Sequence, residues 1–248
     1  GASDMASSLF GMSAYRLEHP QWSGVWPGRM DRRVVGSGVR RPEGQQAVVA
    51  ARLTRGARMT MRSMVRGSDV VFVLVDMQCA LADVMGRRDA VVGASALLAR
   101  AATVLNIPAL VTRQYPRGLG DTVSELAKAL GEHTPIDKVT FSCLAEPAFR
   151  ERIEGLGRRH VVLAGMETHI CITQTALALL EEGYAVSVAA DATCSRRATD
   201  HEIGLARLRD AGAQITVIES VLYEALERAG TPEFRAVLEL VKAHPLGW

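Results

Sequence analysis

The feature that most constrains the fold is an uninterrupted apolar stretch, Val70-Val-Phe-Val-Leu-Val75, which ends at Asp76. β-Branched and aromatic residues favour extended backbone, and a run without polar alternation suits a strand that is buried on both faces. Strands of this kind belong mainly to parallel sheets that are covered by helices on both sides. The run therefore predicts a parallel sheet inside an α/β fold.

Beyond this run, stretches that suit strands alternate with stripes at helical spacing. Six strands that alternate with helices predict a three-layer α/β/α fold with a six-stranded, mainly parallel sheet, right-handed crossovers and a doubly wound, Rossmann-like topology. Pro147 suits the first turn of a helix, and Gly183 and Gly212 suit helix ends. The expected strands are 70–75, 108–112, 135–139, 160–164, 184–189 and 214–218, and the expected helices are 89–105, 121–131, 146–155, 168–182, 198–211, 220–228 and 232–243.

The composition of the chain changes near residue 68. Residues 1–68 carry 11 arginines, no lysine and four acidic residues, a formal charge of +7, whereas residues 69–248 carry 18 basic and 23 acidic residues, a charge of −5. We therefore expect a basic amino-terminal extension over 1–68 and a separate compact domain over 69–248. A disordered tail, a targeting segment and added upstream sequence are all compatible with the extension.

Several classes of protein are disfavoured. No run of eighteen apolar residues occurs, so no membrane-spanning helix is expected. The sequence has no phosphate-binding GxGxxG or GxxxxGK[ST] motif and no CxxC or HExxH metal motif, so neither a cofactor nor a metal is predicted. A body at −5 without a basic stripe argues against a nucleic-acid partner. We expect an intracellular protein, cytoplasmic, or mitochondrial if residues 1–68 are a transit segment.

Three chemically distinct residues follow three different expected strands. Ligands of parallel sheets bind beyond the carboxyl ends of the strands, and Asp76, Lys138 and Cys171 converge there. If Thr168 caps the following helix, Cys171 lies in the first turn, where the helix dipole and the Lys138 ammonium would stabilise a thiolate. Each residue taken alone has an ordinary structural explanation: an Asp that forms a turn, a solvated surface Lys and a buried apolar Cys. The hypothesis of a catalytic site therefore depends on their convergence.

The motifs around these residues resemble the isochorismatase-like cysteine hydrolase superfamily, and most closely its isochorismatase domain-containing protein subgroup. The resemblance covers roughly residues 69–228. The stretches that carry it are Leu74-Val-Asp-Met-Gln78, Arg113-Gln-Tyr-Pro116, Asp137-Lys138 with Phe141-Ser142, Ala164-Gly-Met-Glu-Thr-His-Ile-Cys171, Asp191-Ala-Thr-Cys-Ser-Arg196 and Ala211-Gly-Ala213.

The resemblance implies metal-independent hydrolysis of a small amide or related acyl compound through a thioester, and a homo-oligomer. Asp76, Lys138 and Cys171 match the catalytic triad of the family. A cis peptide falls at Met166–Glu167, and the backbone amides of Glu167 and Cys171 match the oxyanion hole. The residues that match the substrate pocket are Gln78, Tyr115, Phe141, Glu167 and His169.

Departures from the family pattern narrow the range of activities that the resemblance implies. The Asp-x-His metal motif of nicotinamidases is replaced by Arg113-Gln-Tyr115, which disfavours nicotinamidase activity and a bound metal. True isochorismatases lack the cysteine, so Cys171 favours acyl chemistry. Leu81 stands where the family usually has an aromatic residue, so the resemblance does not define what forms one wall of the pocket. A catalytically idle interaction protein and an RNA-binding relative of the kind labelled ribonuclease are the alternatives.

Overall fold

The computed structural model describes residues 64–244, so the expectations for residues 1–63, among them most of the basic extension, lie outside the described part. Within it, β1 (Val70–Val75) is completely buried, as its unbroken apolar run predicts. Alternate residues of β1 belong to two different cores: Phe72 packs in one and Val73 in the other. Both faces of the strand are therefore covered.

The six strands form one sheet in the order β3-β2-β1-β4-β5-β6. Every pair of neighbouring strands is parallel, so the sheet is more uniform than the mainly parallel one expected. This is the doubly wound order in which the direction of winding reverses beside β1. The other strands are β2 (Ala109–Gln114), β3 (Ile136–Lys138), β4 (His160–Met166), β5 (Ala185–Cys194) and β6 (Gln214–Thr216).

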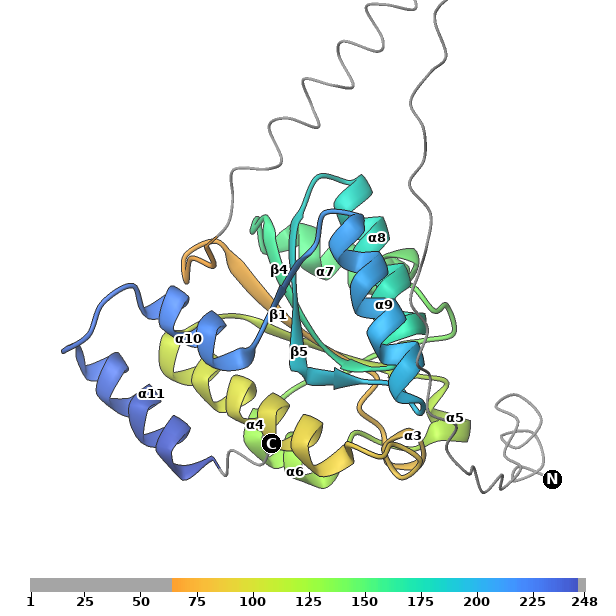
Figure 1. Ribbon diagram of the computed structural model, residues 1–248, viewed down its shortest axis with the longest axis horizontal. Helices are drawn as coiled ribbons and strands as arrows, with labels where there is room; N and C mark the ends of the chain where they lie inside the picture. The colour runs from red at the N-terminus through yellow and green to blue at the C-terminus, as the bar shows by residue number, and fades with distance from the viewer. Residues whose placement is uncertain (1–63, 245–248) are drawn as a thin grey trace, which may run out of the picture. The chain divides into compact units, whose positions relative to one another are not determined.

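Helices cover the sheet on both faces, which completes the predicted three layers (Figure 1). One face is covered by α4 (Arg88–Leu105), α6 (Ser124–Leu130), α10 (Ile218–Leu226) and α11 (Pro232–Ala243). The other is covered by α7 (Pro147–Gly155), α8 (Thr173–Glu181) and α9 (Ala198–Asp210). Shorter turns of helix that the sequence patterns did not predict are α3 (Cys79–Ala82), α5 (Pro116–Leu119) and η1 (Cys143–Ala145).

The expected helix over 168–182 begins differently from the prediction. Thr168–Ile172 winds as a π-helix, η2, before α8 starts, and the residue that caps it is Glu167 rather than Thr168. Thr168 is already helical, and its hydroxyl lies 2.8 Å from His201 Nδ1 on α9. The predicted capping role of Thr168 is therefore wrong, although Cys171 does lie in the first turn.

Two boundaries near Asp191 differ from the prediction. β5 does not end at Ala189 but continues to Cys194, because Thr193 and Cys194 pair with Gly165 and Met166 of β4, and Asp191 lies inside it. The Asp191 carboxylate accepts hydrogen bonds of 3.0 and 3.1 Å from the backbone N–H of Ile218. This cap starts α10 at Ile218, two residues earlier than predicted. As predicted, α7 begins with Pro147, and Gly183 and Gly212 adopt positive φ after helix ends.

The packed domain begins slightly before residue 69, where the sequence predicted its boundary. Val65 is buried in the core on the α4 face, and its backbone N–H donates to Glu224 of α10 at 2.6 Å. Between residues 64 and 244, no helix is both long and apolar enough to cross a membrane.

Candidate active site

The candidate site lies where the winding of the sheet reverses, between β1 and its neighbour β4. Asp76 follows β1 directly, while η2 with Cys171 follows β4 after Glu167. Asp76 adopts a left-handed backbone with φ of 51°, a conformation that aspartate tolerates better than most residues. The reversal point at the carboxyl ends of the strands is the usual ligand position in such sheets.

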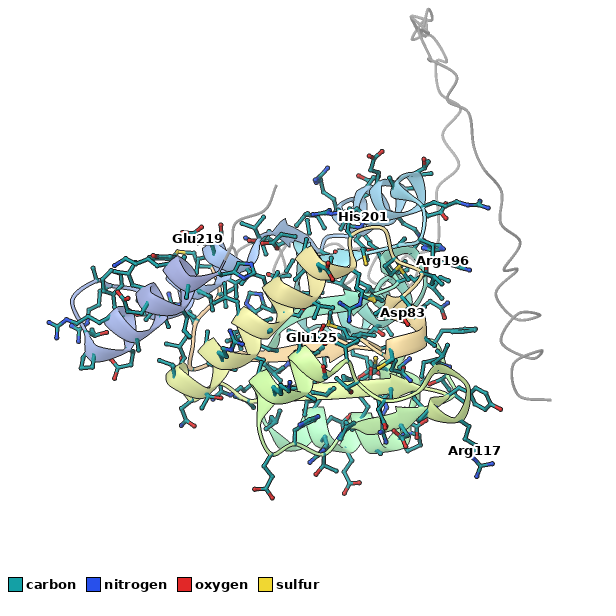
Figure 2. All side chains as sticks on the ribbon, turned by 90° about the horizontal axis from the view of Figure 1, so that it is seen from below. Asp83, Arg117, Glu125, Arg196, His201 and Glu219 are labelled. Atoms are coloured by element: carbon teal, nitrogen blue, oxygen red, sulfur yellow. The ribbon has the colours of Figure 1, made fainter. Side chains whose placement is uncertain are left out.

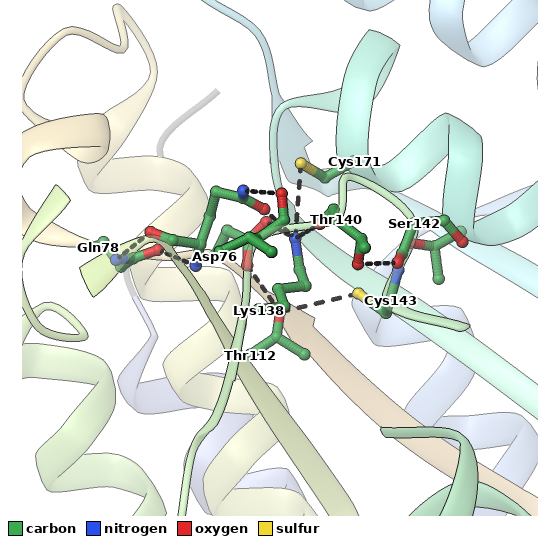
Figure 3. Close-up of polar contacts among 11 residues, drawn as sticks. Asp76, Gln78, Thr112, Lys138, Thr140, Ser142, Cys143 and Cys171 are labelled. Atoms are coloured by element: carbon green, nitrogen blue, oxygen red, sulfur yellow. Dashed lines mark hydrogen bonds and ion pairs between the residues drawn. The ribbon is translucent and has the colours of Figure 1, made fainter. Parts of the chain in front are cut away.

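Lys138, the last residue of β3, forms a buried ion pair with Asp76. Its Nζ lies 2.6 Å from Asp76 Oδ2, and both side chains are 0% exposed (Figure 3). Burial, the largest single effect, lowers the pKa of Lys138, but Asp76, Cys143 and Cys171 together more than offset it, and the pKa is raised. Lys138 is therefore a fixed cation at neutral pH.

The Lys138 ammonium has more acceptors around it than it has protons. Besides Asp76, it contacts Gln114 Oε1 at 2.6 Å, the Thr140 carbonyl at 3.2 Å and Cys171 Sγ at 3.8 Å. An ammonium has three N–H groups, and the three oxygens are the nearer partners. The contact with sulfur is therefore the weakest of the four.

The structure brings the three predicted catalytic side chains together but reverses the expected effect on the thiol. Burial raises the pKa of Cys171, and the Asp76 carboxylate raises it further, against the smaller lowering by Lys138. The physical reason is that Asp76 already neutralises the Lys138 charge at 2.6 Å. Burial and Asp76 thus favour the thiol form of Cys171, whereas the sequence predicted that the helix dipole and Lys138 would stabilise a thiolate.

Two further side chains contact this centre without having been predicted. Thr112 on β2 donates its hydroxyl proton to Asp76 Oδ1 at 2.8 Å and lies 3.8 Å from Cys143 Sγ. Burial raises the pKa of the Cys143 thiol to about 11, so Cys143 remains protonated. Thr112 lies inside an apolar strand, where sequence offers no sign that its hydroxyl faces a carboxylate.

Gln78, which the resemblance assigns to the substrate pocket, is completely buried. Its amide accepts from the backbone N–H of Gln114 at 2.6 Å and donates to the Gln114 and Gly120 carbonyls at 3.0 and 2.7 Å. The polar atoms of this side chain are therefore bonded to backbone, and Gln78 fixes the end of β2.

The residues between β4 and Cys171 are held by the segment that joins β5 to α9. Glu167 Oε2 accepts from both the backbone N–H and Nε of Arg196, at 2.9 and 3.1 Å. His169 Nδ1 lies 2.9 Å from the Ser195 hydroxyl. Figure 2 labels Arg196 and also His201, the residue that contacts Thr168. The Met166–Glu167 peptide is cis, at the position that the resemblance implies.

The two aromatic residues assigned to the pocket are exposed beside Lys138. Tyr115 is 40% and Phe141 48% exposed, and the backbone N–H of Tyr115 donates to the Lys138 carbonyl at 2.9 Å. Val139, next to Lys138, is 73% exposed. These side chains form an apolar rim at the same edge of the sheet as the buried polar centre.

Other features lie apart from this centre. A cavity of about 780 Å³ is lined by the beginning of β2, residues 132–134 and part of α7, and it includes none of the three convergent residues. Within the described chain, no group of three or more His, Cys, Asp and Glu side chains is placed to hold a metal ion.

The fold and the site together define a doubly wound α/β protein with a buried Asp–Lys pair and a cysteine at the reversal point. The model of the isochorismatase domain family matches residues 70–220. The chain therefore belongs to the isochorismatase family, and this membership supports a hydrolase-type function.

Individual relatives agree with this assignment. Secreted isochorismatase effector Isc1 of Phytophthora sojae is 37% identical over 71% of this chain and 86% of its own length. Isochorismatase domain-containing protein 2 of Danio rerio is 39% identical over 71% and 87%. The solved structure of MAR1 ribonuclease from Caenorhabditis elegans is 33% identical, with a TM-score of 0.69, and covers 74% of this chain and 95% of that one.

Proposed function

We propose that this protein is a cysteine hydrolase that cleaves the C–N bond of a small amide, or a related acyl bond, through a thioester on Cys171. The observation that carries the proposal is the fully buried Lys138–Asp76 pair in contact with the Cys171 sulfur. A structural domain gains little by burying an acid, an amine and a thiol together, because desolvating charges is costly.

The first half of the reaction starts from a thiol. Asp76 takes the Cys171 proton as the sulfur attacks the amide carbonyl carbon, and the carbonyl electrons move onto oxygen. The backbone N–H groups of Glu167 and Cys171 hold this oxyanion. As the carbonyl re-forms, the C–N bond breaks, Asp76 returns its proton to the amine nitrogen, and a thioester remains.

The second half returns the enzyme to its resting state. Asp76, again a carboxylate, takes a proton from water while the water oxygen attacks the thioester carbon. The C–S bond breaks and its electrons stay on the Cys171 sulfur, which takes the proton back from Asp76 as the acid leaves. Throughout, Lys138 stays cationic and stabilises whichever of Asp76 and Cys171 carries the negative charge.

The test is incubation of the protein with a panel of small primary and secondary amides, followed by mass spectrometry for an acyl adduct on Cys171. The exposed Cys79 offers a matched control. Cys171→Ala should abolish turnover and the adduct, whereas Cys79→Ala should keep both. Hydrolysis that survives Cys171→Ala would exclude the thioester route.

Names of relatives favour two other activities. A ribonuclease activity follows from the name of the C. elegans protein. The −5 charge of residues 69–248 speaks against it, because nucleic-acid affinity derives largely from phosphate contacts. Cleavage of isochorismate follows from the name of the P. sojae effector. An RNA substrate and isochorismate therefore belong in the same panel of substrates. If the Cys171→Ala variant still turned over either of them, that result would favour the corresponding activity over the proposed amide hydrolysis.

We also propose that the protein self-associates. Large apolar side chains are exposed on the described surface, among them Val139 and Phe141 near the site and Ile203 on α9. Val139 and Phe141 lie two residues apart in the sequence beside Lys138, and neighbouring exposed apolar side chains can mark an interface. Light scattering on the full chain should give a mass that is a multiple of 26.7 kDa, and a monomer at micromolar concentration would contradict the proposal.

A further inference from the structure

We infer that Gln114 is a positioning residue, whose amide oxygen holds the Lys138 ammonium on Asp76 and away from the Cys171 sulfur. The inference rests on the proposed function for its catalytic meaning. The contact that carries it joins Gln114 Oε1 to Lys138 Nζ at 2.6 Å, as short as the ion pair of Lys138 with Asp76.

The orientation of the Gln114 amide is fixed by its other half. Nε2 donates to the Val139 carbonyl at 2.9 Å, so the amide cannot turn its nitrogen toward Lys138 without losing two hydrogen bonds. The oxygen therefore faces the ammonium as a permanent acceptor.

The backbone of Gln114 is fixed in turn by Gln78. The Gln78 amide pairs with both the N–H and the carbonyl of Gln114, as a neighbouring strand would. β3 pairs with Gln114 on the other side, in the register Gln114–Lys138. Gln78, Gln114 and Lys138 thus form a chain of contacts that runs from α3 to the catalytic centre.

The three N–H groups of the Lys138 ammonium are shared among four neighbouring acceptors. Asp76, Gln114 and the Thr140 carbonyl occupy the three N–H groups, which leaves the sulfur at 3.8 Å with the weakest share. The groups that act electrostatically on Cys171 are Asp76, Lys138 and Cys143. Gln114 therefore keeps Cys171 protonated until substrate arrives, so that its proton passes to Asp76 during the attack.

Two substitutions of similar size separate this role from a structural one. In Gln114→Met the ammonium loses an acceptor and is free to turn one N–H toward the sulfur, which favours the thiolate. In Gln114→Glu a second carboxylate competes for the ammonium, which disfavours it. The two variants should thus change thiol reactivity in opposite directions, whereas mere loosening of the structure would raise reactivity in both.

The experiment is iodoacetamide alkylation of the full chain at pH 8, with the rate at each cysteine followed by mass spectrometry of peptides. Cys171 should react at least about tenfold faster in Gln114→Met and at least about tenfold slower in Gln114→Glu than in the natural sequence, which corresponds to one pKa unit each way. Exposed Cys79 should react at the same rate in all three proteins and serves as the internal control.

Turnover of an amide substrate supplies the second measurement. Both variants should lower kcat more than they raise KM, because the contact acts on the reacting groups rather than on binding. Changes of the same sign at Cys171, or no change, would overturn the inference. Opposite changes at Cys171 in a protein that hydrolyses no amide would uphold the positioning role and contradict the proposed function, so the two failures are distinguishable.

Discussion

The buried pair of Asp76 and Lys138 should be strongly coupled in stability, and a double-mutant cycle measures that coupling. The changes are Asp76→Asn and Lys138→Met, singly and together. Asparagine tolerates the left-handed backbone of position 76, so the first change adds no backbone strain. Methionine keeps most of the length of lysine and removes both the charge and the three N–H donors of the ammonium.

The magnitude follows from complete burial at 2.6 Å. Removing one partner of a buried ion pair leaves an uncompensated charge and typically costs about 3–5 kcal/mol. Asp76→Asn should fall at the lower end of this range, because Lys138 keeps Gln114 and the Thr140 carbonyl as acceptors. The double variant has no unpaired charge, so its cost should stay below the sum of the two single costs by about 1–3 kcal/mol.

Equilibrium unfolding in urea at pH 7, followed by circular dichroism, supplies the free energies of unfolding. Lys242→Met is the matched control, because Lys242 forms only an exposed contact with Glu239 and should change stability by less than about 0.5 kcal/mol. Strictly additive costs in the double variant would refute the coupling, and with it the argument that Asp76 and Lys138 act as one unit.

Two further predictions concern the thiol and the sheet. Because burial and Asp76 raise the pKa of Cys171, its alkylation by iodoacetamide should be slow at pH 7 and should accelerate as the pH is raised; a faster reaction at Cys171 than at exposed Cys79 at pH 7 would show a resting thiolate. Gly165→Ala should prevent folding or greatly lower Tm, because Gly165 has φ of 127° and an added Cβ would collide with the Val75 backbone of β1, whereas Gly86→Ala, with open space around it, should leave Tm nearly unchanged; equal Tm values by calorimetry would contradict the close packing of β1 on β4.

Much of this architecture could be predicted because burial leaves a direct pattern in sequence. The apolar run of β1 and the helical stripes between strands predicted the layers, and the strand ends predicted which side chains converge. The convergence of Asp76, Lys138 and Cys171 needed no knowledge of side-chain contacts, since parallel strands bring their carboxyl ends to one edge.

The remaining details depend on contacts between distant residues, which local pattern does not contain. The extension of β5 depends on its pairing with the end of β4, and the first residue of α10, Ile218, donates its backbone N–H to the distant Asp191 carboxylate. The state of Cys171 depends on its burial and on the fact that the Lys138 ammonium lies 2.6 Å from Asp76 but 3.8 Å from the sulfur. The sequence thus indicated which residues converge here, but it did not indicate that burial and Asp76 raise the pKa of the Cys171 thiol.

The central claim is that Cys171 forms a thioester with the substrate, and trapping this intermediate tests it most directly. The protein is mixed with an amide that it hydrolyses, quenched in acid within the first turnover and analysed by mass spectrometry of its peptides. The account predicts that the peptide containing Cys171 gains the mass of the acyl group, and that Asp76→Asn lowers the rate at which this mass appears. Hydrolysis with no acyl mass on Cys171 at any quench time, or with the acyl mass on another residue, would contradict it.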